Sequence, residues 1–574
     1  MKIERTALLL ALSLHLWAFS RLGALPFMLG LLLAGMAAAL AGKRGIYFVL
    51  FLLPLVNSLV WFLPVELPFN YPALSLYPVV GYVLFKKEGE KSTPYYSFFL
   101  PLLWTGAFFL LLRWSNITLS PLAFLKNTPV APGGPRLSFG ILLLAFTLFL
   151  YTAGSRGYHL LKDINLDLAL RTMSLSTLIS LGVALIQSSG RFVLLPPGPW
   201  RWVFRYNGTF SDPNAAGIFS AALFSWLLLR SKSLKEALWS LPPLGMVFLS
   251  SSRTGLIIVF LAMVFFVFDK ALSTKFKAIF VPIFLLGLLV SLPHLHRRMK
   301  KYVKENPDMT VVSEGRNILY SRALRALKTA PLSGVGPGNF IFFVMAEYDN
   351  PGLNDVVPSV YLGMAAELGM AGLAGFLLFL LPYLLARPGP EKKVFLLFLF
   401  ALLVHSALWN PEVILLFFFL LGQMKPPEMR WQRIARLLLL ASFLLGSLVS
   451  FQKLHPATWS VEKGKIYSYG LYPREEGFSW TRKKAGIYFI FRKPVILESG
   501  FPFEKTGRKA QKVRVFWRGK RLKTLTFTPS RRKAELEVRG RGFLEFRISP
   551  TFVPARFERK GDRRVLGVKI LGTW

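Results

Sequence analysis

The chain has 574 residues, of which 53% are hydrophobic, with a mean hydropathy of +0.47 and a formal net charge of +41. A soluble domain needs far less apolar sequence, so these values exclude an ordinary soluble protein. Cysteine is absent, which excludes disulfides and thiolate zinc sites. The positive charge makes nucleic acid and anionic lipid candidate partners. Because Lys and Arg collect in the cytoplasmic loops of membrane proteins, nucleic acid is not expected.

Apolar segments recur over the first ~450 residues, at lengths near the roughly 20 residues that a bilayer-spanning helix needs. Charge-free stretches occur at Phe27–Ala41, Phe98–Leu112, Thr254–Phe268 and Phe376–Leu385. Backbone groups in lipid must be satisfied within their own segment, and barrel-type alternation is missing, so the segments are predicted to be helices. We expect about fifteen spans, centred near residues 13, 31, 54, 78, 104, 146, 178, 222, 244, 262, 285, 372, 400, 417 and 442.

Seven basic connections separate these spans, namely "GKRG", "KKEGEK", "SRGYHLLKD", "RSKSLKE", "DKALSTKFK", "RPGPEKK" and "KPPEMRWQR". If the N-terminus is cytoplasmic, all seven fall on the cytoplasmic side, as the positive-inside rule requires. The other side receives the segments at residues 113–136, 190–214, 250–253 and 292–358. Arg253 lies on that side against the charge bias, which makes it a functional candidate.

After residue 452 the sequence becomes strand-like. The stretches "KVRVFWRGKRLKTLTFTP", "KAELEVRG" and "GFLEFRIS" alternate apolar and polar residues around short turns, which predicts β-hairpins. We therefore expect a transmembrane domain over residues 1–452, with an extracytoplasmic loop at 292–358, and an extracytoplasmic β-sandwich over 453–574. The second domain holds 30 Lys and Arg against 10 Asp and Glu. This charge indicates either a solvated surface or one that docks on anionic lipid headgroups or an anionic glycan.

Two polar segments of the outer side carry arginine. "RYNGTFSDPNAAG" begins at Arg205 and precedes the eighth predicted span. Its Asp212 and Asn214 flank a proline at a helix entry, so they are expected to cap that span. Arg205 is not needed for such a cap, which makes it a functional candidate. "SSSRTG" places Arg253 in a tight turn between two spans. The planar fork of Arg offers five donors that match phosphate oxygens.

Two later segments complete the set. "GRNILYSRALRALKTAPLSGVGPGNF" has apolar residues at helical spacing among Arg and Lys, which predicts a basic amphipathic helix on a membrane surface. Its "GVGPGNF" follows a helix and lacks Lys-Ser/Thr, so it is not expected to bind nucleotide. "NDVVPSVYLGMAAELGMAG" enters the twelfth span, and Glu367 follows Ser359 by about two helical turns. A carboxylate at that depth should face protein or a wet cavity.

The outer side thus gathers Arg205, Arg253 and Arg316 with a few carboxylates and amides. No metal-ligand spacing is present and the six His are scattered, so neither a metal site nor another cofactor is expected. Arginines at a lipid–water boundary fit a diphosphate, because they would stabilise its negative charge as it leaves. We therefore expect a diphosphate-binding site on this side.

These four segments, in this order, resemble the O-antigen ligase and O-antigen polymerase superfamily. The shared pattern reads "R-x-x-G-x-F-x-x-P-N", "S-x-S-R-x-G", "R-x-x-x-W" through "P-x-x-G-x-G-x-G-x-F", and "H-N-x-Y-L…E-x-G-x-x-G". Here it is found at Arg205–Asn214, Ser250–Gly255, Arg316–Phe340 and Tyr361–Gly372, within roughly residues 200–385. Tyr320 stands where the pattern has Trp, and Pro358-Ser359 stand where it has His-Asn.

The resemblance implies an all-α polytopic membrane protein with a GT-C-like helical bundle, acting as an inverting, metal-independent glycosyltransferase. It would take a glycan from a polyprenyl diphosphate, such as undecaprenyl diphosphate, at the outer face of the bacterial inner membrane. The acceptor would be a lipid or a glycan, as in lipopolysaccharide and other polysaccharide biosynthesis of the cell envelope.

The same resemblance gives roles to residues. The arginines of the family bind the diphosphate, which implies this role for Arg205, Arg253 and Arg316. The loop His that serves the family as the proposed base is missing here. The nearest carboxylates, Asp355 and Glu367, are therefore the candidates for catalysis. Supporting roles are expected for Asn207, Asp212, Asn214, Ser359 and Tyr361.

Two other classes of function stay open. A transporter or flippase for a lipid-linked glycan would need a polar pathway through the spans, and they carry few charges away from the outer face. A non-catalytic glycan-binding membrane protein would bind the donor without turning it over. Ligase and polymerase differ in their acceptor, which would sit where the family His is replaced, so the sequence leaves that choice open as well.

Overall fold

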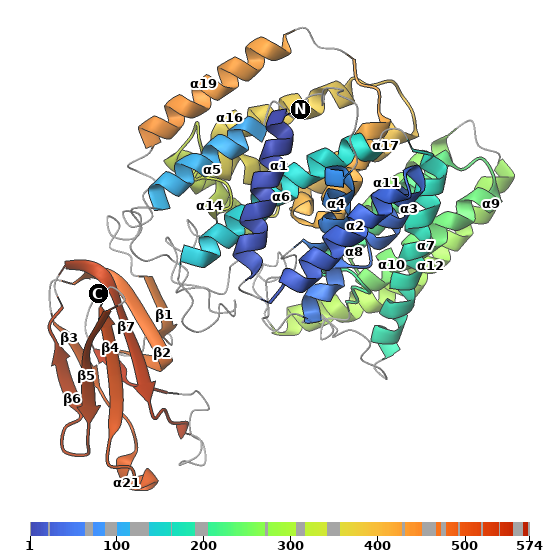
Figure 1. Ribbon diagram of the computed structural model, residues 1–574. Coiled ribbons are helices and arrows are strands. Elements are labelled where there is room, and N and C mark those ends of the chain that lie inside the picture. The colour runs from blue at the N-terminus through green and yellow to red at the C-terminus, as the bar shows by residue number, and fades with distance from the viewer. Residues whose placement is uncertain are drawn as a thin grey trace. The chain divides into compact units, whose positions relative to one another are not determined.

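The computed structural model describes residues 2–20, 23–62, 73–85, 100–114, 137–161, 164–189, 205–269, 274–305, 316–340, 356–427, 431–450, 467–471, 478–491, 494–517, 520–538, 540–554 and 566–571. The chain forms two compact units (Figure 1). The first, here called the helical unit, comprises Met1–Ala107, Ile141–Gly338 and Asp355–Leu448. The second comprises Phe108–Gly140, Asn339–Asn354 and Val449–Trp574. The described strands all lie in the second unit, within residues 467–571, here called the β region.

Helices form where the apolar segments predict them. The first half of the chain gives α1 (Lys2–Ser20), α2 (Leu25–Leu40), α3 (Lys43–Leu52), α4 (Tyr77–Phe85), α5 (Leu100–Trp114), α6 (Leu137–Leu161) and α7 (Leu166–Ser189). The second half gives α8 (Pro213–Arg230), α9 (Leu234–Ala237), α10 (Leu241–Ser250), α11 (Arg253–Phe268), α12 (Thr274–Glu305), α14 (Arg316–Thr329), α16 (Val360–Leu384), α17 (Pro390–Val404), α18 (Pro411–Gln423) and α19 (Gln432–Ser450). The basic helix predicted after Gly315 is α14.

Three of the described helices, α7, α16 and α19, are long and apolar enough to cross a membrane. Shorter apolar helices accompany them, and α4 has nine residues where a full span is predicted. Large apolar side chains stand exposed on several helices, for example Phe268 and Leu437. Such surface is typical of a protein that contacts lipid. By length and composition these helices indicate a membrane protein, and the count of fifteen spans stays a prediction.

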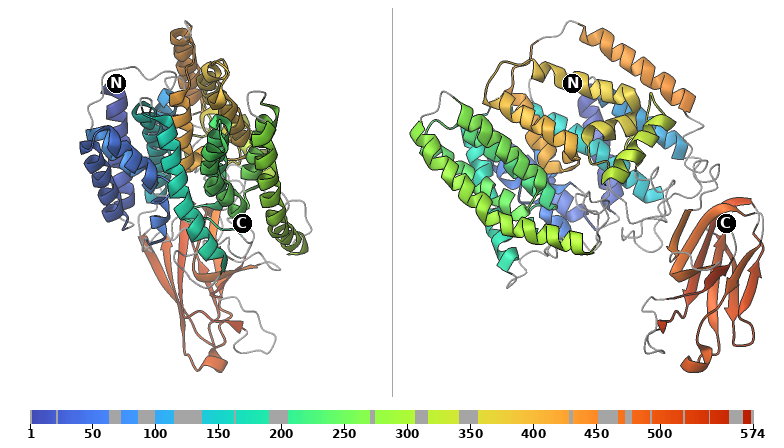
Figure 2. Two further views of the ribbon diagram at one scale, coloured as in Figure 1. Left: turned by 90° about the vertical axis from the view of Figure 1, so that its right-hand side faces the viewer. Right: turned by 180° about the vertical axis from the view of Figure 1, so that it is seen from behind.

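Helix α12 extends into the segment that was predicted as the long outer loop. The loop was expected from residue 292, whereas α12 continues to Glu305 with Pro282 and Pro293 inside it. The apolar pattern ends near residue 292, but the following Lys and Arg favour a helix as well, so the helix outlasts the hydropathy signal. In both views of Figure 2, α12 lies at an edge of the helical unit.

Ion pairs gather at one end of four helices. Arg230, which ends α8, pairs with Asp167 in the first turn of α7 at 3.1 Å and with Glu391 in the first turn of α17 at 2.6 Å. Lys393 of α17 pairs with Asp269, just after α11, at 2.7 Å. These residues come from connections that the charge pattern assigns to one side. The structure brings them together at one face, here called the ion-pair face.

The other ends of these helices therefore lie together on the opposite side. Helix α8 begins after Asp212, α11 begins at Arg253, and α17 ends at Val404. The 18 residues of α8 rise about 27 Å, which is close to the thickness of a bilayer core. We call the side marked by these three residues the arginine face. The first two polar segments singled out in the sequence lie on it.

Glycines allow α8 and α11 to touch near the arginine face. A Cβ added at Gly255 would lie 2.7 Å from the carbonyl oxygen of Gly217. A Cβ added at Gly217 would lie 2.2 Å from the Cβ of Ser252. Such distances are far below van der Waals contact. The glycine of "SSSRTG" is therefore a requirement of helix packing.

The β region is one antiparallel sheet. Its strands are β1 (Tyr467–Leu471), β2 (Phe478–Phe491), β3 (Val495–Glu498), β4 (Gln511–Trp517), β5 (Lys520–Phe527), β6 (Lys533–Leu536), β7 (Gly540–Ser549) and β8 (Lys569–Leu571). They lie in the order β5-β4-β7-β2-β8-β3-β6, and β1 pairs with β2. The long strand β2 pairs with β8 through its first residues and with β7 through its last ones, so it links the two halves of the sheet.

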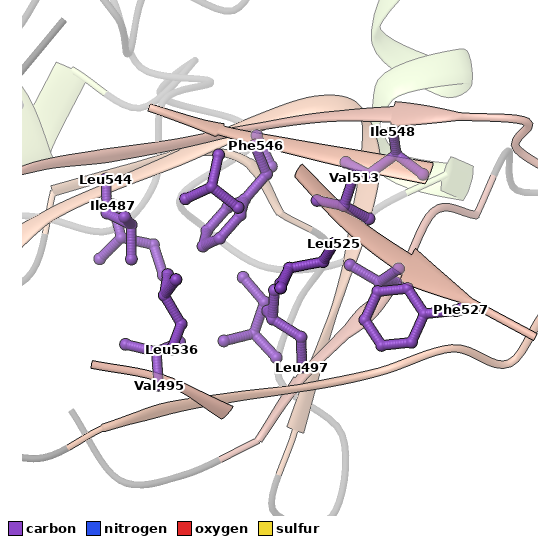
Figure 3. Close-up of a cluster of buried hydrophobic side chains, with 14 of the residues drawn as sticks. Ile487, Val495, Leu497, Val513, Leu525, Phe527, Leu536, Leu544, Phe546 and Ile548 are labelled. Atoms are coloured by element: carbon purple, nitrogen blue, oxygen red, sulfur yellow. The ribbon is translucent and has the colours of Figure 1, made fainter. Parts of the chain in front are cut away.

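The two halves of the sheet share one apolar core (Figure 3). Ile487 and Leu544 come from β2 and β7, and Figure 3 shows Val495 and Leu536 of β3 and β6 across from them. All four side chains are buried. The alternation of apolar and polar residues that predicts strands is the alternation between this core and solvent. The predicted β-rich C-terminal region is confirmed.

Substitution of Gly255 tests the close packing of α8 and α11. We expect Gly255→Ala to lower the free energy of unfolding by about 1–3 kcal/mol, because the new methyl group forces the two helices apart. Gly182→Ala on α7 is the matched control, since nothing lies within 4 Å of a Cβ there. The measurement is thermal unfolding of the purified protein in detergent. Equal midpoints for the two variants would contradict the packing role.

Candidate functional site

The segment over residues 205–212 is tied into the helical unit. The side chain of Gln187 accepts a hydrogen bond from the Gly208 amide at 3.0 Å and donates one to its carbonyl at 3.2 Å. Gly208 has φ 57°, a left-handed conformation that favours glycine. The Thr209 hydroxyl donates to the Pro54 carbonyl at 2.7 Å. The segment is therefore fixed from two sides, and most of it is buried.

Arg205 joins the first two polar segments. Its Nε donates to the Ser250 carbonyl at 3.1 Å, and its Nη2 donates to Asn214 Oδ1 at 2.5 Å. The side chain is 6% exposed. We call these three residues the Arg205 junction. They connect the entry of α8 to the turn between α10 and α11, so the guanidinium that was predicted to bind a diphosphate also binds protein.

Asp212 is the N-cap of α8, as its position in the sequence indicates. Its Oδ1 accepts hydrogen bonds from the Asn214 and Ala215 amides. Asn214 was expected to help cap this helix, and here the structure differs. It lies inside the first turn, and its side chain accepts from Arg205. The pKa of the Asp212 carboxyl is raised, because the effect of burial outweighs the opposite effects of the Arg205 guanidinium and the cap hydrogen bonds.

Arg253 is the first residue of α11. It follows the N-cap Ser252, whose hydroxyl oxygen accepts from the Gly255 amide at 3.3 Å. Ser251, just before, has φ 50°. The Arg205 junction holds this turn through Ser250, three residues before Arg253. The side chain of Arg253 is half-buried on the arginine face.

Helix α14 brings Arg316 to the arginine face as well. Its Nη1 donates to the carbonyl of Val404, which ends α17, at 3.3 Å. One turn further along α14, the Tyr320 hydroxyl donates to the Pro358 carbonyl at 3.4 Å. Because Val404 marks the arginine face, the ends of α14, α16 and α17 meet there.

Glu367 holds the glycine-rich loop that follows α14. Its Oε2 accepts from the Gly338 amide at 3.0 Å, and its carbonyl accepts from the Gly336 amide at 2.8 Å. The loop lies against a kink of α16 at Gly369, which has φ 70°. A Cβ at Gly334 would lie 2.3 Å from the carbonyl carbon of Glu367. The glycines of "SGVGPGNF" therefore allow the backbone of this loop to lie close to the backbone of α16.

Two of the predicted site residues, Ser359 and Glu367, line one cavity of about 30 Å³. Ser359 is also the N-cap of α16. The other cavity residues are Leu103, Thr147, Tyr151, Val356, Val357, Val360, Gly363, Met364, Leu368, Ser406 and Trp409. Two further predicted residues are not among them. The Tyr361 hydroxyl donates to the Leu399 carbonyl at 3.4 Å, and Asp355 lies outside the described residues.

Sequence reasoning missed the polar residues around the entry of α18. Glu412 is fully buried, and within the described part of the chain neither carboxyl oxygen has a hydrogen-bond partner. It lies beside Asn57 and Asp212. The Asn57 amide in turn donates to the Ser211 hydroxyl at 2.8 Å. A signal was present, because "NPE" interrupts an apolar run much as "DPN" does before α8.

The short segment over residues 406–412 contacts the cavity that holds Glu367 and also lies near Asp212. Its Ser406 and Trp409 line the cavity that holds Glu367. Its Glu412 interacts electrostatically with Asp212, the N-cap of α8. A carboxylate in a cavity and guanidinium groups on one face are the parts that a transfer from an anionic leaving group requires.

Substitution of Arg205 tests its structural role. We expect Arg205→Ala to lower the free energy of unfolding by about 1–3 kcal/mol, because the buried Ser250 carbonyl and the half-buried Asn214 side chain lose their donor. Arg171→Ala is the control, since Arg171 is an exposed arginine of α7. Thermal unfolding and limited proteolysis within residues 205–214 give the readout. A variant as stable as the control would show that the junction does not hold this segment.

Comparison with known families supplies the identity of this region. The family model for O-antigen ligase (Wzy_C) matches residues 237–377, which include Arg253, Arg316 and Glu367, while Arg205 precedes the match. No curated protein matches the chain significantly. The match indicates glycan processing of the ligase or polymerase type at a membrane. Residues 237–377 thus match an O-antigen ligase domain, and this match supports membership of the chain in the O-antigen ligase superfamily.

Proposed function

We propose that the protein transfers a glycan from a polyprenyl-diphosphate donor to a lipid or glycan acceptor at the outer face of the bacterial inner membrane. The observation that carries this proposal is the meeting of three arginine-bearing segments on the arginine face, next to a cavity that holds a carboxylate. Arg253 and Arg316 lie within the O-antigen ligase match, and Arg205 fixes the turn before Arg253. The roles of Arg253, Arg316 and Glu367 in the transfer are part of this proposal.

The proposed chemistry is a single displacement. The acceptor hydroxyl attacks the anomeric carbon of the donor sugar from the side opposite the diphosphate. The bond between that carbon and the diphosphate oxygen breaks, and its electron pair leaves with the polyprenyl diphosphate. Guanidinium groups of Arg253 and Arg316 stabilise this charge, and no metal takes part. The proton of the hydroxyl passes to a carboxylate, for which Glu367 is the described candidate.

Arg253 is the sharpest test of donor binding. In nanodiscs with a polyprenyl-diphosphate-linked glycan and an acceptor, we expect Arg253→Ala to lower kcat/KM about 10²–10³-fold. Arg253→Lys should restore part of it, because a point charge remains but the bidentate fork is lost. Arg171→Ala serves as the control. If Arg253→Ala transfers glycan at the parental rate while thermal unfolding is unchanged, the proposed diphosphate site is wrong.

Glu367→Gln separates the proposed base from the structural role of the same side chain. The amide oxygen of Gln can still accept the hydrogen bond from the Gly338 amide, so the glycine-rich loop should stay in place. We expect kcat to fall about 10²-fold or more, with an unchanged thermal midpoint and loss of the acidic limb of the pH–rate profile. Parental kcat in Glu367→Gln would leave Glu367 with a structural role alone.

A further inference from the structure

One face of the β region carries exposed cations in register. Along β4, the side chains of Val513 and Val515 point into the core, and those of Lys512 and Arg514 are exposed. Lys512 and Arg514 therefore lie on the face of the sheet that is turned away from the core. We call this the cationic sheet face.

The strand register places like charges directly opposite one another on this face. Arg514 of β4 lies directly opposite Arg547 of β7, in one row across the sheet. Directly opposed side chains in an antiparallel sheet have Cβ atoms about 4.5–5.5 Å apart, and like charges there are destabilising. The row therefore carries an electrostatic cost in the isolated fold. An anionic partner would offset that cost.

Little of this charge is neutralised within the β region. Arg547 forms an ion pair with Glu545 at 2.9 Å and lies over the ring of Phe516, with Cζ 4.4 Å from its centre. Among the residues that the structure describes, no carboxylate pairs with Lys512 or Arg514. The excess extends to the whole C-terminal sequence, with 30 Lys and Arg against 10 Asp and Glu over residues 453–574.

The connection after α19 keeps the β region within reach of a membrane. Helix α19, which is long and apolar enough to span, ends at Ser450, and β1 begins at Tyr467. The sixteen residues between them reach at most about 55 Å when fully extended. The β region can therefore contact the bilayer surface at the end of α19 without leaving its attachment.

We propose that the cationic sheet face docks on the anionic phospholipid headgroups of the bilayer that holds the helical unit. Near an anionic membrane surface each exposed Lys or Arg adds to the electrostatic attraction, without the concave site that a specific sugar ligand needs. This attraction is screened by salt. The charge of the C-terminal sequence is spread widely, which fits a diffuse surface better than a single small ligand. Docking is independent of the proposed glycan transfer.

The absence of cysteine permits a clean labelling experiment on the full chain. Thr526 of β5 is exposed and directly opposite Lys512, so Thr526→Cys places a fluorophore on the cationic sheet face. Glu535→Cys on β6 is the control label, because Glu535 is exposed on the other half of the sheet. Quenching by acrylamide, which is neutral, is measured in nanodiscs of phosphatidylcholine with and without phosphatidylglycerol.

With phosphatidylglycerol, we expect quenching of the label at residue 526 to fall several-fold and to recover at high salt, while the label at residue 535 stays accessible. Lys512→Glu with Arg514→Glu should abolish this protection. Arg531→Glu with Lys533→Glu, which changes the net charge equally in an exposed turn and strand start, should retain it. Equal quenching in both kinds of nanodisc would overturn the proposal. So would equal loss of protection in both double variants, or protection that an anionic glycan gives without phosphatidylglycerol.

Discussion

Arg205 places a guanidinium inside the protein, and the geometry of the arginine face depends on it. A buried charge is costly unless it is hydrogen-bonded and has opposite charge nearby. Arg205 meets both conditions through the Ser250 carbonyl, the Asn214 side chain and the neighbouring Asp212. These contacts fix the entry of α8 against the turn before α11. The glycines at the α8–α11 contact then allow the two helices to lie at the distance that this junction requires.

The junction also explains how segments far apart in the sequence can serve one site. The ion pairs at the opposite face join ends of α7, α8, α11 and α17, and the ends of α8, α11 and α17 that mark the arginine face lie on the other side. The segment over residues 406–412 then connects the neighbourhood of Arg205 to the cavity of Glu367. The proposed function assigns these two neighbouring places to the leaving diphosphate and the acceptor.

Much of this arrangement could be predicted from the sequence, because it follows from local patterns. Apolar runs predicted the helices, alternation predicted the strands, and Asp212 before a proline predicted the cap of α8. The four ordered motifs predicted the superfamily, which the match over residues 237–377 confirms. Residue roles, membrane sidedness and the domain boundary at residue 452 stay predictions.

Tertiary contacts account for the rest. The cavity gathers Tyr151 of α6 with Ser406 and Trp409 of the segment over residues 406–412, and no local pattern marks such neighbours. Glu412 became notable through its complete burial, which a sequence does not display. Asn214 was assigned to the cap although its side chain bonds to Arg205, because the partner lies across a folded loop. Helix α12 outlasted its apolar run, since helix formation by Lys and Arg does not depend on burial.

The most direct test of the central claim is release of polyprenyl diphosphate by the purified full-length protein. The protein in nanodiscs would be incubated with a polyprenyl-diphosphate-linked glycan and a panel of lipid and glycan acceptors, without added nucleotide or metal. We expect stoichiometric release of polyprenyl diphosphate, with the glycan joined to an acceptor. The length of the product would distinguish ligase from polymerase. Binding of the donor without release, across the whole panel, would contradict the proposed transfer and favour a binding or transport protein.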